Sequence, residues 1–196
     1  MHTAPRTTVA KRHTAAVTTQ AQRRGVCFEG YVMDRLCINL GKLLDNPSVK
    51  TLLKPELHTV HCLVDVAACR NSGFEILAPL AQPTADAAYC PAFRVGGVSG
   101  FHKTLTLARK QGNKNAGCST CTGNAVDKGF RALFVGTVSR SATWSPDNPI
   151  LLQVTEVLTA GSKCPNSLAK TQAPCGIPVT TTARATTTAR ATSHGT

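Results

Sequence analysis

The chain has 196 residues, of which 42% are hydrophobic, and a formal net charge of +12. This length is sufficient for one domain with its own core, and no stretch approaches the roughly 18 apolar residues that would span a bilayer. The positive charge is concentrated at the two ends, because residues 26–160 have 13 basic and 10 acidic side chains and a charge of only +3. We therefore expect no nucleic acid binding by the folded part.

The N-terminal residues 1–25 are rich in Thr, Ala and Arg and contain no acidic side chain. They lack the apolar run of a secretory signal. We expect a disordered basic arm or a segment similar to an organellar transit peptide. The location stays open between organellar and exported.

The first structured elements are a strand at residues 27–34 and a helix from His58 to Cys69. Gly41 and the Asp45-Asn46-Pro47 sequence mark a turn between them. His58 or Thr59 is a candidate cap for the helix, and Gly73 is a candidate left-handed residue after its end. On a continuous helix His58, His61, Cys62, Asp65 and Cys69 share one face.

Further strands are predicted at residues 74–78, 89–95, 102–108, 131–139 and 150–158. The last two are joined by Ser145-Pro-Asp-Asn-Pro149 and are expected to pair antiparallel. The predicted fold is mainly β with one inserted helix (α+β), arranged as a small OB-like β-barrel or a sandwich. A mixed α+β sheet is the alternative.

The C-terminal residues 161–196 contain the hexapeptide Thr-Thr-Thr-Ala-Arg-Ala twice, at 180–185 and 186–191. Such a composition cannot bury enough apolar surface to fold. We therefore predict three parts: a basic arm over residues 1–25, a globular Cys/His domain over residues 26–160, and a disordered tail over residues 161–196.

Nine cysteines give two interpretations that depend on the compartment. In an oxidising compartment three or four disulfides are expected, with Cys164 and Cys175 as the natural tail pair. In a reducing compartment the same residues indicate a metal site. The odd number leaves at least one thiol that is unpaired or binds a metal.

The leading hypothesis is a non-catalytic domain that binds zinc, with copper as the alternative, because both metals accept thiolate and imidazole ligands. The candidate ligands are Cys37, His58, His61, Cys62, Cys69, Cys118 and Cys121. The Cys118-Ser-Thr-Cys121 motif, flanked by glycines, resembles half of a zinc knuckle. No protein partner or oligomeric state is indicated.

Three other interpretations stay open. The Cys118/Cys121 pair is also the pattern of a thiol-redox protein. An exported domain stabilised by disulfides would need no site at all, and Cys37, Cys62 and Cys69 would then form a disulfide and a free thiol, with the histidines exposed. His58 and Cys62, four residues apart, could form a nucleophilic pair, but chance supplies such pairs in any cysteine-rich chain. Asp34 and Asp65 are more typical of turn caps and hydrogen-bond acceptors than of a catalytic pair.

Four short motifs occur in order along residues 26–158: Gly30-Tyr-Val-x-Asp34-x-x-Cys37, His58-x-x-x-Cys62, Cys69-x-x-Ser-Gly-Phe74 and Gly136-Thr-Val138. In this order the chain resembles a group of small, often exported bacterial domains. The resemblance implies a compact β-rich domain in which the Cys/His cluster recurs, and it implies no mechanism.

Overall fold

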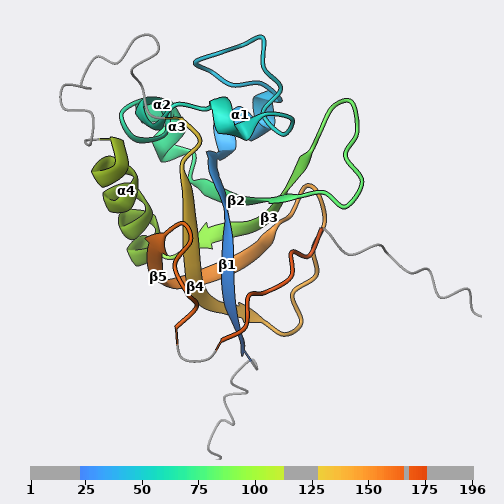
Figure 1. Cartoon of the computed structure of the whole chain (residues 1–196), viewed down its shortest axis with the longest axis vertical. Helices are drawn as coiled ribbons and strands as arrows, with labels where there is room; N and C mark the ends of the chain where they lie inside the picture. The colour runs from blue at the N-terminus through green and yellow to red at the C-terminus, as the bar shows by residue number, and fades with distance from the viewer. Residues whose placement is uncertain (1–22, 113–127, 166–167, 176–196) are drawn as a thin grey trace, which may run out of the picture.

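The protein folds around a closed five-stranded barrel with the strand order β1-β2-β3-β5-β4 (Figure 1). The computed structural model describes residues 23–112, 128–165 and 168–175. The strands are β1 (Arg23–Asp34), β2 (Phe74–Pro79), β3 (Tyr89–Gly96), β4 (Arg131–Ser139) and β5 (Ile150–Thr159). β3 and β5 are parallel, and the other neighbours are antiparallel. The predicted small OB-like barrel with few helices is confirmed, in preference to a sandwich.

Side chains fill the inside of the barrel. Val26, Phe28 and Val32 alternate along β1 and belong to the main buried cluster, as do Phe93 and Phe134. The rings of Phe28 and Phe93 have their centroids 5.1 Å apart. A five-stranded barrel is too narrow to hold both these side chains and a ligand, so binding sites lie on its outer surface.

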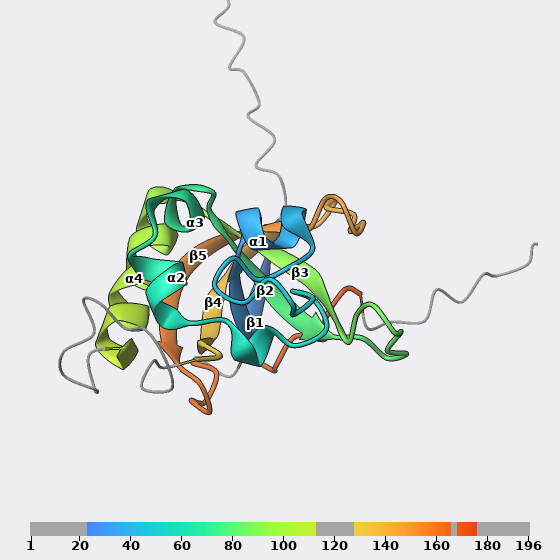
Figure 2. The same ribbon diagram turned by 90° about the horizontal axis from the view of Figure 1, so that it is seen from above.

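The helices lie outside the barrel (Figure 2). They are α1 (Arg35–Leu40), η1 (Pro55–Leu57), α2 (Val60–Val64), α3 (Ala67–Asn71) and α4 (Val98–Gly112). All except α4 belong to the long connection between β1 and β2, which gathers at one end of the barrel (Figure 1). No helix in the described part of the chain is long and apolar enough to cross a membrane.

The strand predicted at residues 102–108 is wrong, because these residues form the middle of α4. The alternation of Thr and Leu at 104–107 matches a strand, but Phe101, Leu105 and Ala108 also follow a helical repeat. Leu105 and Ala108 are buried in the main core. Thr104 adapts to the helix by donating its hydroxyl to the carbonyl of Gly100 at 2.8 Å.

The C-terminal segment after β5 is tied to the barrel by two disulfides. Cys27 bonds to Cys164, and Cys90 bonds to Cys175. The predicted Cys164–Cys175 pair is therefore wrong. We call the described residues of 161–175 the C-terminal strap; they continue the folded unit beyond residue 160, where the sequence placed its boundary.

The strap also bonds to the backbone of β1. Thr171 donates its N–H to the carbonyl of Cys27 at 2.7 Å, and its hydroxyl oxygen accepts the N–H of Cys27 at 3.0 Å. Leu168 packs on Leu133 and Val135 of β4. These contacts explain why part of the predicted tail is ordered. The predicted arm, apart from Arg23 to Gly25 in β1, and the rest of the tail lie outside the described residues.

Candidate metal centre

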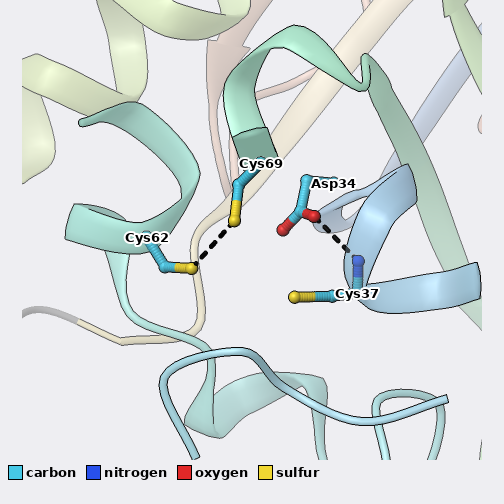
Figure 3. A group of neighbouring side chains, drawn as sticks. All are labelled: Asp34, Cys37, Cys62 and Cys69. Atoms are coloured by element: carbon cyan, nitrogen blue, oxygen red, sulfur yellow. Dashed lines mark hydrogen bonds between the residues drawn. The ribbon is translucent and has the colours of Figure 1, made fainter. Parts of the chain in front are cut away.

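Four buried side chains from the connection between β1 and β2 point toward one another (Figure 3). They are Asp34, Cys37, Cys62 and Cys69, which we call the cysteine cluster. One ligand atom from each lies within 4.8 Å of the others. The chain segments that carry them are the end of β1, α1, α2 and α3. Residues that are 35 positions apart in sequence therefore meet at one point.

Asp34 and Cys37 are placed by the start of α1. Asp34 is the N-cap, and its Oδ1 accepts the backbone N–H of Cys37 at 2.9 Å. The helix ends after one and a half turns at Gly41, which has a φ of 68°. The hydroxyl of Thr51 donates to the carbonyl of Cys37 at 2.7 Å. Both ends of this short helix are thus fixed, and the Cys37 side chain is fully buried.

Cys62 and Cys69 meet because the predicted helix from His58 to Cys69 is broken. Thr59, one of the two predicted cap residues, caps α2 by accepting the N–H of Cys62, but α2 ends at Val64. Val66 is extended and begins α3. On a continuous helix seven residues would separate the two cysteines by about 10.5 Å along the axis. The break brings their sulfur atoms to 3.1 Å.

His58 lies beside the cluster, at the end of η1 rather than on α2. Its Nε2 is 3.1 Å from Asp34 Oδ2 and 3.8 Å from Cys37 Sγ. It also forms a group with Asp45 and Cys62 whose ligand atoms lie within 4.8 Å of one another. The ring is buried, so its polar atoms depend on these neighbours.

The acidities in the cluster depend on these contacts. The pKa of Cys37 falls to about 6, first because the Cys62 thiol donates a hydrogen bond to it and then because of His58, while burial opposes the change. The pKa of His58 rises to about 9, because its contacts with Asp34 and Cys37 outweigh burial. The hydrogen bond to Cys37 and burial raise the pKa of Cys62, and burial raises that of Cys69 to about 12. At neutral pH the cluster holds the Cys37 thiolate beside an imidazolium.

Asp34 has a buried oxygen with no hydrogen-bond donor. The His58 contact with Oδ2 has the distance of an ion pair, but it is not aligned as a hydrogen bond, so Oδ2 has no hydrogen-bond partner among the described residues. Burying such an atom costs free energy unless a donor or a cation satisfies it; the protonated ring of His58, 3.1 Å away, is the cation nearest to it among the described residues. The oxygen faces three sulfur atoms that are suitable metal ligands.

Among the described residues, His61 is the predicted ligand that is not part of the cluster or of the group around His58. The Nδ1 of His61 is paired with Asp65 at 2.9 Å, on a partly exposed surface of α2. Cys118 and Cys121 lie outside the described residues, so the knuckle and redox interpretations of that motif stay predictions. Sequence reasoning placed Asp34 at a turn cap, which is one of its roles, and missed it as a ligand. Its position three residues before Cys37 was the available signal.

Phe93, Phe101 and Phe130 lie near basic residues in the sequence and would be the candidates for stacking on nucleic acid bases, but all three pack in or against the main core. Phe93 and Phe130 are buried in the main core. The ring of Phe101 is stacked on Phe74, with the centroids 5.1 Å apart. The rings of Phe93 and Phe130 are therefore not available for stacking on a base, whereas Phe101 is partly exposed.

The chain was compared with models of protein families, with curated proteins and with solved structures, and no match was found. The fold and the site therefore define the class of protein. It is a disulfide-bonded OB-type barrel whose β1–β2 connection encloses a cluster of three thiols, a carboxylate and an adjacent histidine.

Proposed function

We propose that this domain binds one Zn²⁺ ion at the cysteine cluster and that the ion is structural, not catalytic. The observation that carries the proposal is the convergence of four buried ligand atoms within 4.8 Å of one another. With Zn–S bonds of about 2.3 Å, the ligands of a tetrahedral zinc ion are separated by about 3.8 Å. The 4.8 Å limit of the cluster accommodates this separation, and the sulfur atoms of Cys62 and Cys69, now 3.1 Å apart, would move apart by less than 1 Å on binding. His58 is then either the alternative fourth ligand or the cation that balances the thiolates.

The mixed donors favour zinc over copper. Three thiolates alone would also suit Cu(I), which prefers soft ligands. Asp34 adds a hard carboxylate oxygen, and zinc accepts carboxylate, imidazole and thiolate together. Because the Cys37 thiol is already ionised near neutral pH, binding has to displace protons chiefly from Cys62 and Cys69. The charge of the ion offsets the repulsion between adjacent thiolates.

The two disulfides of the barrel support this interpretation of the remaining thiols. Disulfides persist in oxidising compartments, so we infer that the protein matures in one. Two thiols whose sulfur atoms are 3.1 Å apart would be oxidised there unless something occupied them. A bound zinc ion keeps Cys62 and Cys69 reduced.

A structural role follows from burial. The side chains of Asp34, Cys37, Cys62 and Cys69 are each at most 1% exposed. A catalytic zinc site keeps a coordination position open to substrate. The geometry of the cluster instead closes the long β1–β2 connection, which contains short helices of three to six residues that have little stability in isolation.

The test is metal analysis of the full chain, purified without a polyhistidine tag. Cys118→Ser/Cys121→Ser serves as the background, so that these two thiols cannot supply the metal site. We expect about one equivalent of zinc per chain, three free thiols, and loss of zinc in Cys62→Ser and Cys69→Ser. His61→Ala is the matched control and should keep the metal, because His61 pairs with Asp65 outside the cluster.

Cobalt replacement gives a second measurement, in which the absorption spectrum reports the type of ligand atom, provided that the variant is shown to be folded. Thiolate-to-cobalt charge-transfer absorption in the background protein, weakened in Cys37→Ser, would support ligation by the cluster. Metal-free folded protein with a Cys62–Cys69 disulfide would overturn the proposal. That result would leave a domain stabilised by three disulfides.

A further inference from the structure

A cavity of about 470 Å³ lies on the outer surface of the barrel, apart from the cysteine cluster. It is bordered by β2 and β3, by α1 and by the connection between β4 and β5. Three of its lining residues, Arg35, Glu75 and Arg94, form one charged group. This group comes from three different elements.

Glu75 is the centre of the group. Its side chain is only 5% exposed, and its Oε1 lies 3.5 Å from Arg35 Nε and 3.2 Å from Arg94 Nε. Glu75 and Arg94 are also cross-strand partners in the β2–β3 pair. The carboxylate therefore holds both guanidinium groups by the same atom, and their positions are set by the sheet and by α1.

The two arginines have unused donors. Each contacts Glu75 through Nε, and Glu75 is the only polar partner of either guanidinium within the described part of the chain. Their Nη groups can therefore donate to a ligand in the cavity. Paired guanidinium groups match the geometry of a carboxylate and make charge-assisted hydrogen bonds with it.

The rest of the cavity determines the size and charge of what fits. Pro91, Pro149, Ile38 and Leu52 supply apolar walls, and Asp147 adds an exposed carboxylate. With Asp147 included, the charges of the four ionic side chains cancel. The group therefore has no net charge with which to attract an anion, and it disfavours a phosphate dianion more than a monoanion, which the paired guanidinium donors hold by hydrogen bonds; Asp147 can accept a hydrogen bond from the ligand.

The wall formed by the β4–β5 connection is held in place. Trp144 donates its indole N–H to the carbonyl of Pro91 on β3 at 2.7 Å. Ser145 and Asn148 exchange backbone hydrogen bonds across the turn. Asp147 therefore lies on a loop that is held by hydrogen bonds, so ligand binding would not have to order this loop.

We propose that this cavity binds a small organic monocarboxylate that has an apolar body and a hydroxyl or amino donor. Its carboxylate bonds to the Nη groups of Arg35 and Arg94, and its donor bonds to Asp147. The apolar body lies against the proline and leucine walls. The proposal is independent of the zinc site, because no residue of the cysteine cluster lines the cavity.

The experiment titrates the folded full chain with 2-hydroxy-4-methylpentanoate, followed by the NMR signals of the arginine side chains. We expect saturable binding that shifts the Arg35 and Arg94 signals, and at least tenfold weaker binding of the corresponding amide and of inorganic phosphate. Arg35→Gln and Arg94→Gln should each weaken binding about tenfold, the loss of one charge-assisted hydrogen bond. Arg131→Gln is the matched control, because Arg131 pairs with a different glutamate, Glu29.

Asp147→Asn provides a variant that does not threaten the fold, because Asp147 is exposed. It should reduce the preference for the hydroxy acid over 4-methylpentanoate while keeping the preference for carboxylate over amide. The proposal is overturned by equal binding of acid and amide, by unchanged affinity in Arg35→Gln/Arg94→Gln, or by no binding up to the solubility of the probe. Zinc content measured on the same samples tests the other site separately.

Discussion

Glu29 is the residue at which the barrel and the C-terminal strap are joined by charge. Its carboxylate lies 3.0 Å from Arg131, 3.4 Å from Lys170 and 3.2 Å from the N–H of Gly161. Burial alone would raise its pKa, but these hydrogen bonds and charges outweigh burial and lower it. A glutamate with a lowered pKa stabilises the folded state when it is ionised.

Glu29→Gln should therefore reduce the free energy of unfolding by about 1 kcal/mol at pH 7. The contribution is present above the ordinary pKa of 4.5 and is lost as the pH falls through the lower folded-state value. Urea unfolding at pH 7 and in strong acid measures the difference. The exposed Glu156→Gln is the control. A gap between wild type and Glu29→Gln that persists below both pKa values would contradict this assignment.

Individual site residues could be named from the sequence where their side chains are typical metal ligands, namely thiols and imidazoles. Cys37, His58, Cys62 and Cys69 were all candidates, and the structure brings them together. Asp34 was interpreted as a cap because cap residues are common before a helix, and nothing in its neighbours shows that its second oxygen faces the sulfurs. The disulfide partners Cys27 and Cys90 could not be chosen, because sequence spacing does not determine connectivity.

At the scale of elements, Gly30 and Gly136, which belong to two of the short sequence motifs, are needed because neighbouring strands approach closely at these positions. A Cβ on Gly136 of β4 would lie 2.2 Å from the carbonyl oxygen of Gln153, and one on Gly30 of β1 would lie 2.2 Å from that of Leu77. Gly136 adjoins an irregularity in the β4–β5 register. The backbone, and not a flexible side chain, occupies the space, so neither position can accept a larger residue without strand movement.

Gly136→Ala is expected to destabilise the barrel by at least about 2 kcal/mol, the range of overpacked cores. Gly25→Ala is the matched control in the same barrel. Its Cβ would meet only the end of the Leu168 side chain, at 3.1 Å, which can move. Thermal unfolding of both variants measures the effect. Similar melting temperatures for the two variants would show that β4 and β5 can separate at little cost.

The five strands were predictable because β-branched and aromatic residues recur between turn signals. The inserted helix was placed correctly but its break was not, because the shared face of His58 to Cys69 suggested continuity. Val66 is β-branched, which slightly disfavours a helix, and this was the local sequence signal for the interruption. Whether such a weak preference interrupts a helix depends on tertiary contacts. The prediction for the α4 segment was wrong for a similar reason. The alternation of Thr and Leu fits the two-residue period of a strand, but the apolar residues of the same segment also fit the period of a helix.

At the scale of the whole molecule, two restraints act at different places along β1. Cys27 bonds to the strap, and Asp34 belongs to the cysteine cluster seven residues later. Seven residues of an extended strand span about 23 Å. In Figure 1, α1, α2 and α3 lie at the upper end of the barrel, and the strap, coloured orange-red, runs along its lower part and side. The disulfides and the proposed zinc ion therefore stabilise separate regions.

This separation predicts that removing one disulfide lowers stability without releasing zinc. The Cys27–Cys164 bond joins residues 137 positions apart, and loss of such a cross-link costs about 2–5 kcal/mol. Because Cys90–Cys175 still holds the strap, we expect the lower half of that range for Cys27→Ser/Cys164→Ser in urea unfolding, with unchanged zinc content. Lys170→Ala, which removes only an exposed ion pair of the strap, should cost less than about 0.5 kcal/mol. Loss of zinc from the folded double variant would instead show that the strap and the cysteine cluster are coupled through β1.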